Sequence, residues 1–417
     1  MSSTLPPPGP PPTDAPPRTG AAISEAAVPE AALPEAAVPE AALPDAVVPA
    51  VPAPAAGPPA PRARLRALDG LRLIAALMVA TYHYVVRGGD AWHRPVRELL
   101  PHLIAPSAYG PLGVQIFFVI SGFVICMSGW GRSVKEFAVS RISRLYPAYW
   151  AALILVAVVL FLIGEQTVSR TDLITNFTML QTPAGAQRQL GVSWTLWAEL
   201  RFYALFALTV LWRGATHRRV LAFCALWTLG AVYAQGSGDG FLQLALMPDY
   251  APFFVGGIGL YLVFRFGHDL VNWSVVATGF LLGQHYAVKA LVAPRSSHPF
   301  YLRSPTVVIV LVAAGFAAVA AATLVPRVAR VEWRWLTTAG ALTYPFYLVH
   351  EILGTKVIDR LEHHTSLPAG AVLALAIGSM LLLAWLVHRL VERPLAPLLR
   401  RRLSAPLPGG PLLGSSR

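Results

Sequence analysis

Ten stretches of about 20 predominantly apolar residues run along this chain, and they constrain its fold more than any other feature. An α-helix of about 20 residues crosses the hydrocarbon core of a bilayer, which is about 30 Å thick. We therefore predict an all-α integral membrane protein, a bundle of about ten transmembrane helices. The sixth span contains Pro248 and Pro252, so we expect that helix to be broken or kinked. The predicted spans are 71–87, 110–129, 146–164, 193–212, 219–235, 241–264, 271–291, 306–325, 336–354 and 370–388.

The composition agrees with a membrane protein and excludes several other classes. The 417 residues are 55% hydrophobic and 13% charged, whereas a soluble domain carries about 25% charged residues. The net charge of +12 does not predict nucleic-acid binding, because the arginines lie between apolar runs and form no basic face with interleaved aromatics. The two cysteines, Cys126 and Cys224, lie in apolar segments. They exclude a disulfide framework and a cysteine-based metal site, and we expect no bound metal.

Three regions differ in composition. Residues 1–61 hold 18 of the chain's 37 prolines and repeat a pentad of the type EAAVP, which predicts a disordered Pro/Ala-rich cytoplasmic tail. Such a tail serves as a spacer or binds a partner, and the spacer is the commoner case. Residues 62–399 are predicted to form the ten-helix membrane domain, and 400–417 a short basic cytoplasmic C-terminal tail. We see no cleavable signal peptide.

The distribution of basic residues predicts the orientation. An even number of spans places both termini on one side of the membrane. The loops and ends on that side carry twenty Lys and Arg residues, against eight on the opposite side. Because basic residues collect in cytoplasmic loops, we predict a multi-pass protein of the plasma (inner) membrane with both termini in the cytoplasm.

Ionisable residues recur at one depth of the bundle. His83, Glu199, His350 and Asp249 all come out in the outer half of the membrane when depth is counted at about 1.5 Å per residue. Ionisable groups in a bilayer cost several kcal/mol each, so they face the bundle interior and mark a site or pathway. A shared layer favours a functional site over polar contacts between helices. Neither Tyr203 nor Ser121 belongs to this layer; both lie nearer the midplane.

A second group of charges lies at the predicted cytoplasmic edge. Arg141 and Arg144 are three residues apart and neighbours on a helix face. Arg72 lies at the same level. It is eleven residues before His83, so the two side chains leave one helix face about 16 Å apart. Clustered arginines suit a phosphate or pyrophosphate; the alternative is that they only follow the rule for cytoplasmic loops.

Six motifs appear in an order that resembles a known family: LRALDGLRLIAALMVATYH, GPLGVQIFFVISGFVI, FAVSRISRLYPAYW, VSWTLWAELRFY, YPFYLVH and VERPL. Together they resemble acyltransferase family 3, the multi-span O-acyltransferases that include O-antigen and nodulation-factor acetylases and macrolide acylating enzymes. The resemblance extends from about Arg64 to Pro394. Many members carry a further soluble hydrolase-like domain. We expect none here, because 23 residues follow Pro394 in this sequence, and this leaves the acceptor open.

The resemblance implies a donor and a donor site. The family's arginine–ten residues–histidine motif falls on Arg72 and His83, and its paired arginines fall on Arg141 and Arg144. It implies that cytosolic acyl-coenzyme A is a co-substrate, with no permanently bound cofactor, and that the three arginines hold its phosphates. His83 would act as a general base or form a transient acyl-imidazole.

The resemblance also implies roles for residues on the later helices. Glu199 and Tyr203 match the pattern SWTLxxExxFY, and Tyr344 and His350 match a late tyrosine–histidine motif. Glu199 is expected to orient the His83 imidazole or to balance its charge, and His350 to position a hydroxyl-bearing glycan or small-molecule acceptor. Tyr203, Tyr344 or Ser121 would donate hydrogen bonds to the oxyanion, with Ser121 at the donor site.

Two other functions are compatible with parts of the sequence. A multi-span transporter or flippase of a glycan or lipid would also have polar residues in mid-membrane and a broken helix, but the halves show no inverted repeat. A scaffold or sensor would explain the proline-rich tail and leave the buried polar layer unexplained. The six ordered motifs favour the acyltransferase.

Overall fold

The computed structural model describes residues 65–165, 168–292 and 303–405. Throughout these ranges the regular structure is helical, which confirms the predicted all-α class. The predicted tail at 1–61, and residues 406–417 of the predicted C-terminal tail, lie outside the described residues.

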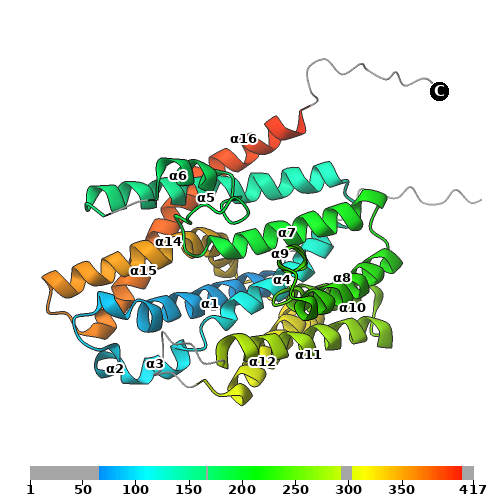
Figure 1. Ribbon diagram of the computed structural model, residues 1–417, viewed down its shortest axis with the longest axis horizontal. Helices are drawn as coiled ribbons and strands as arrows, with labels where there is room; N and C mark the ends of the chain where they lie inside the picture. Colours follow the sequence, from blue (N-terminus) through cyan, green and yellow to red (C-terminus); the bar gives the residue numbers. More distant parts are fainter. Residues whose placement is uncertain (1–64, 166–167, 293–302, 406–417) are drawn as a thin grey trace, which may run out of the picture. The chain divides into compact units, whose positions relative to one another are not determined.

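Each of the ten predicted spans coincides with a helix or a pair of helices (Figure 1). Short helices and turns fill the connections, among them the π-helical turns η1 and η4 and the 3₁₀ turns η2 and η3. The elements in chain order are α1 (Arg66–Tyr82), η1 (His83–Arg87), η2 (Gly89–Ala91), α2 (Val96–Leu99), α3 (Pro101–Ser107), α4 (Leu112–Gly129), α5 (Val134–Leu162), α6 (Arg170–Phe177), α7 (Ser193–Thr209), η3 (Leu211–Arg213), α8 (His217–Ser237), α9 (Gly240–Leu246), α10 (Ala251–Phe266), α11 (Leu270–Val292), α12 (Pro305–Leu324), α13 (Pro326–Ala329), α14 (Arg334–His364), α15 (Ala369–Val387), η4 (His388–Glu392) and α16 (Arg393–Ser404).

Eight helical segments of the described chain are long and apolar enough to cross a membrane. They correspond to predicted spans two to eight and to the tenth. The first and ninth predicted spans, which correspond to α1 with η1 and to α14, are helical but fall outside this set. The helix α1 has 17 residues, and α14 extends over 31 residues with several ionisable side chains. The helix α1 is thus shorter than each of the eight segments, whereas α14 is long but carries ionisable side chains.

Several helix boundaries differ from the predicted ones, and two of them have a clear origin or consequence. The helix α5 begins twelve residues before the predicted start at 146, because Ser133 and Glu136 form a capping box at its N-terminus. The backbone N–H of Ser133 donates to Glu136 Oε2 over 2.9 Å, and this reciprocal pairing satisfies N–H groups that a helix start leaves free. At the other end of the chain, α16 continues to Ser404, so the predicted boundary at 399 lies inside a helix.

The predicted break in the sixth span is confirmed. The helix α9 ends at Leu246 and α10 begins at Ala251. Between them Met247 has a φ of 52°, a left-handed conformation that is uncommon for a residue with a side chain. Pro248 follows Met247, and a proline disfavours the α conformation in the residue before it.

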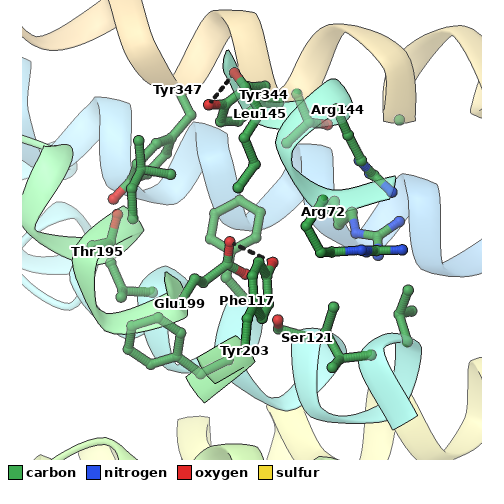
Figure 2. Close-up of a pocket in the computed structure, with 18 residues that line it drawn as sticks. Arg72, Phe117, Ser121, Arg144, Leu145, Thr195, Glu199, Tyr203, Tyr344 and Tyr347 are labelled. Carbon is green, nitrogen blue, oxygen red and sulfur yellow. Dashed lines mark hydrogen bonds between the residues drawn. The ribbon is translucent and has the colours of Figure 1, made fainter. Parts of the chain in front are cut away.

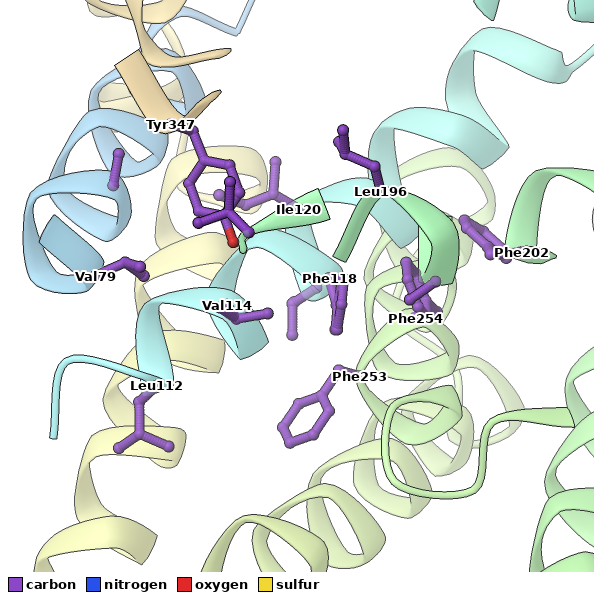
Figure 3. Packing of buried hydrophobic residues seen from close by; sticks show 14 of the residues in the cluster. Val79, Leu112, Val114, Phe118, Ile120, Leu196, Phe202, Phe253, Phe254 and Tyr347 are labelled. Carbon is purple, nitrogen blue, oxygen red and sulfur yellow. The ribbon is translucent and has the colours of Figure 1, made fainter. Parts of the chain in front are cut away.

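Glycines let α4 and α10 approach closely. A Cβ atom on Gly122 would lie 2.9 Å from the carbonyl carbon of Phe254 and 3.1 Å from the Cα of Gly257. Small residues at a helix interface allow two backbones to pack closely in a membrane. Such packing matters there because lipid tails are as apolar as helix surfaces, so the hydrophobic effect does not drive helices together. The ring of Phe254 then lies 4.5 Å from that of Phe118 and 4.4 Å from that of Phe202 (Figure 3). This aromatic packing joins α4, α7 and α10.

The helices α1 and α14 pack against each other, again at glycines. Gly340 faces Asp69 and Gly354 faces Tyr84, and neither glycine has room for a side chain. The Tyr84 hydroxyl donates to the backbone carbonyl of His350 over 2.9 Å. Because Tyr84 lies in the π-helical turn η1, which begins at His83, this contact places His83 directly opposite α14. Such π-helical turns occur frequently at functional sites.

Candidate active site

A pocket opens among five helices, α1, α4, α5, α7 and α14, and contains about 870 Å³ of empty space, counting the space at its open mouth. Figure 2 shows Arg72 and Arg144 at one end, Thr195 and Tyr347 at the other, and Glu199 between them. The residues that line the pocket are Arg72, Val114, Phe117, Phe118, Ser121, Val124, Ile125, Arg141, Arg144, Leu145, Thr195, Leu196, Glu199, Tyr203, Gly340, Thr343, Tyr344 and Tyr347.

The three predicted phosphate-binding arginines all line this pocket. Arg72 pairs with Asp69, one turn earlier on α1, at 3.1 Å. Arg141 is buried, donates to the Ser128 hydroxyl over 3.2 Å, and leaves its Nε without a hydrogen-bond partner. Arg144 is exposed at the pocket wall. This end of the pocket therefore has positive charge and unused N–H groups with which to bind an anion.

The middle of the pocket holds the predicted hydroxyl donors. The Tyr203 hydroxyl donates to Glu199 Oε2 over 3.0 Å, and the Tyr344 hydroxyl donates to the Leu145 carbonyl over 3.0 Å. Both hydroxyl hydrogens already have acceptors, so neither is free to bind a developing oxyanion without breaking a bond. Ser121 is buried and lines the same wall.

The end of the pocket opposite the arginines adjoins the predicted histidines through Tyr347. Its ring lines the pocket, lies 5.6 Å from the Phe117 ring, and lies 5.5 Å from the imidazole of His350. Figure 2 shows Tyr347 and Thr195 pointing toward each other. The side chain of Tyr347 thus contacts both the pocket and the buried histidine.

His83 and His350 form a hydrogen-bonded pair. His83 Nδ1 and His350 Nε2 are 3.0 Å apart, and His350 Nδ1 lies 2.9 Å from the Tyr347 carbonyl oxygen. His350 is completely buried, among Tyr84, Phe346 and Tyr347, and His83 is 9% exposed. The two histidines that the sequence placed at similar depth therefore lie in direct contact.

These contacts determine which nitrogen of His83 can react. A carbonyl only accepts hydrogen bonds, so His350 Nδ1 carries a hydrogen and donates it to Tyr347. A neutral His350 then accepts at Nε2, and His83 Nδ1 donates to it. A neutral His83 consequently has its free lone pair on Nε2. His350 fixes this tautomer, which is one of the two roles expected for Glu199.

An acidic residue that sequence reasoning missed lies beside that nitrogen. Glu351 Oε1 is 3.6 Å from His83 Nε2 and 3.9 Å from Arg87 Nε. Its Oε2 is buried and has no hydrogen-bond partner. The carboxylate lies against Gly191, where a side chain would have no space. One signal was available in the sequence: Glu351 directly follows His350 inside a predicted span.

Two residues of the predicted polar layer lie apart from the histidine pair. Glu199 bonds to Tyr203 in the pocket, and in the described part of the chain no contact joins it to His83. Asp249 is exposed in the turn between α9 and α10. The predicted pairing of Glu199 with His83 is therefore not found, because equal depth along two helices does not determine which way their side chains point. In the described ranges, no group of three His, Cys, Asp or Glu residues could hold a metal ion.

Comparison with known proteins supports the same family that the motifs resemble. A family model described as an acyltransferase domain matches residues 65–389. Acyltransferase MdmB of Streptomyces mycarofaciens is 28% identical over 394 residues, which cover 82% of this chain and 95% of that protein. Exopolysaccharide production protein ExoZ of Rhizobium meliloti (strain 1021) is 35% identical over 106 residues, 24% of this chain and 33% of that protein. No solved structure matches. The chain is thus a multi-pass membrane protein that belongs to acyltransferase family 3.

Proposed function

We propose that this membrane acyltransferase moves an acetyl or other short acyl group from cytosolic acyl-coenzyme A to a hydroxyl group of its acceptor. The observation that carries the proposal is the pocket itself. One end has three arginines, and the other end adjoins a hydrogen-bonded histidine pair through Tyr347.

The basic end of the pocket supports coenzyme A as the donor. Arg72, Arg141 and Arg144 suit the phosphates of coenzyme A, because guanidinium groups bind phosphate oxygens with charge-assisted hydrogen bonds. The free Nε of Arg141 supplies one such donor. Coenzyme A is cytosolic, so the pocket mouth faces the cytoplasm in this proposal. This agrees with the basic-residue distribution that places both termini there, in the plasma (inner) membrane.

The histidine pair supports transfer by general base catalysis. Nε2 of His83 takes the proton of the acceptor hydroxyl while the oxygen attacks the thioester carbon. The carbon–sulfur bond then breaks, and the protonated imidazole returns its proton to the departing thiolate. His350 holds His83 in the tautomer that this step requires. Nucleophilic attack by the same nitrogen, to form an acyl-imidazole, is the other use of this lone pair.

The acceptor is proposed only by class: a glycan, a lipid-linked sugar or a secondary metabolite with a free hydroxyl. The name of ExoZ, which refers to exopolysaccharide production, supports the first. The name of MdmB refers to acyl transfer and does not name an acceptor. Membership of an acyltransferase family favours this reading over transport without chemistry.

A donor experiment tests the proposal. The purified protein in lipid nanodiscs is titrated with acetyl-coenzyme A and with acetyl-pantetheine, which has the same thioester without the nucleotide phosphates. We expect binding of the first and at least about 10-fold weaker binding of the second, since each charged hydrogen bond contributes about 1.5–3 kcal/mol. Equal binding of the two donors would contradict the proposed role of the arginines.

A second experiment identifies the acceptor. Glycans, lipids and small metabolites of a producing strain and of a deletion strain are compared by mass spectrometry. We expect a compound of the parental strain to lose one acetyl, propionyl or butyryl increment in the deletion strain, and the purified protein to restore it from acyl-coenzyme A. Transfer by the purified protein to an amine instead of a hydroxyl would contradict O-acylation.

A further inference from the structure

Glu351 lies where a carboxylate can act on the reacting nitrogen without blocking it. The distance of 3.6 Å between Glu351 Oε1 and His83 Nε2 is too long for a hydrogen bond, so the lone pair of Nε2 remains free. It is short enough for a strong charge interaction, because attraction between unit charges rises as the medium becomes less polar than water. The position therefore suits a group that acts through His83.

The carboxylate is held in place from several sides. It occupies the space that a side chain on Gly191 would need, and the backbone of Val192 lies beside it. Arg87 lies 3.9 Å from Oε1 on the other side. The Glu351 side chain is only 16% exposed. A buried carboxylate oxygen without a hydrogen-bond partner, as Oε2 is here, costs free energy and calls for an explanation.

We infer that Glu351 is the positioning residue of the transfer step. Its carboxylate stabilises the positive charge that the His83 imidazole acquires when Nε2 takes the proton of the acceptor hydroxyl. The proton remains on His83 until the carbon–sulfur bond breaks, and it then passes to the thiolate. His350 and Glu351 thus act on different ring nitrogens of His83. His350 fixes the tautomer through Nδ1, and Glu351 balances the positive charge beside Nε2. This inference rests on the proposed function.

Other charged or titratable groups also lie near His83 and Glu351. Among them, the carboxylate of Glu351 has the strongest electrostatic effect on a protonated His83. His350 and Glu351 face His83 from α14, and Arg87 faces it from η1. Arg87 and Arg188 face Glu351. The Arg87 side chain is 62% exposed, so solvent screens its charge more than that of the buried carboxylate.

The test compares Glu351→Gln with the parent in nanodiscs, over a range of pH, with acetyl-coenzyme A and the identified acceptor. We expect kcat to fall about 10- to 100-fold and KM for the donor to stay unchanged, because the lost charge interaction acts only after proton transfer. The rise of kcat with pH should also move to lower pH, because the protonated imidazole has lost its anionic neighbour. Glu351→Asp should recover part of kcat.

A matched control and a second variant keep the outcome decisive. Glu362→Gln makes the same substitution on the same helix, about three turns away, and should keep the parental kcat and pH profile. If Glu351→Gln does not fold, Glu351→Met decides, because methionine has a similar length and no charge: a lower kcat with a displaced profile supports the inference, and parental behaviour overturns it. Parental kcat in Glu351→Gln also overturns it. If His83→Gln is inactive while Glu351→Gln is parental, this inference fails and the proposed function stands.

Discussion

The basic pocket and the histidine pair are neighbours with opposite physical character. The pocket is open, and its arginines are partly exposed or incompletely hydrogen-bonded. The histidine pair is closed, and His350 is completely buried with both ring nitrogens in hydrogen bonds. Charged groups with unused N–H donors beside an open volume suit the binding of an anion. A buried imidazole with one free lone pair suits proton transfer. The contrast predicts that binding and chemistry respond to different substitutions.

The largest expected effect is at the histidine pair. His83→Gln keeps some hydrogen bonding but cannot act as a base near neutral pH. We expect the rate of acyl transfer to fall about 10²- to 10⁴-fold, with donor affinity unchanged because His83 does not line the pocket. Single-turnover transfer and donor titration measure the two quantities separately. A parental transfer rate at parental expression would mean that His83 only packs helices together.

The next largest effect is expected on donor affinity. Arg141→Ala should weaken acetyl-coenzyme A binding about 10- to 100-fold, and Arg141→Lys should restore part of it, because lysine keeps the charge but loses the planar fork. The transfer rate at saturating donor should change far less. Lys135→Ala, an exposed residue of the same helix outside the pocket, is the control. Unchanged donor affinity in Arg141→Ala would show that this pocket does not bind the phosphates of the donor.

A smaller effect is expected at Tyr344. Its size distinguishes a hydroxyl that stabilises the fold from one that takes part in catalysis. Tyr344→Phe removes the hydrogen bond to the Leu145 carbonyl, and should lower the free energy of unfolding by about 1 kcal/mol. Because its hydrogen is already bonded, we expect less than about a 10-fold loss of kcat. Thermal unfolding and steady-state transfer measure the two effects. Loss of an oxyanion donor costs about 10²- to 10³-fold, so a loss of that size would assign Tyr344 to the oxyanion.

The smallest effect is expected from removing residues 1–60. This segment has the composition of a disordered tail, and the pocket and the histidine pair are formed by residues between Arg72 and His350. Donor affinity and transfer rate should both remain within about threefold of the full chain. Comparison at equal amounts of purified protein excludes a difference in expression. A truncated protein that is well expressed and inactive would show that the tail recruits something the reaction needs.

Much of the fold could be predicted because it depends on local sequence. The apolar runs located a helix at each of the ten predicted spans, eight of which are long and apolar enough to cross a membrane, and Pro248 located the break in the sixth one. The early start of α5 was also readable: the sequence SVKE at Ser133 is a capping-box signal in front of an apolar run. The spacing of Arg141 and Arg144 predicted that they share a face, and both line the pocket.

The partners of the buried polar groups could not be predicted in the same way. The rise per residue gave His83, Glu199 and His350 similar depths, but depth does not determine the direction of a side chain. That direction depends on how each helix is rotated against its neighbours. The close approach of α1 to α14 at Gly340 and Gly354 turned His83 toward His350, while Glu199 on α7 came to lie beside Tyr203.

By itself the sequence determined the helices, the family and the residues that carry ionisable groups into the bundle, because apolar length, proline positions and motif order are local properties. Only the tertiary structure decided that His350 and Glu351 share the two nitrogens of His83, and that Asp249 lies exposed in a turn. The physical reason is that contacts between helices distant in sequence depend on where small residues allow backbones to meet, and no single helix contains that information.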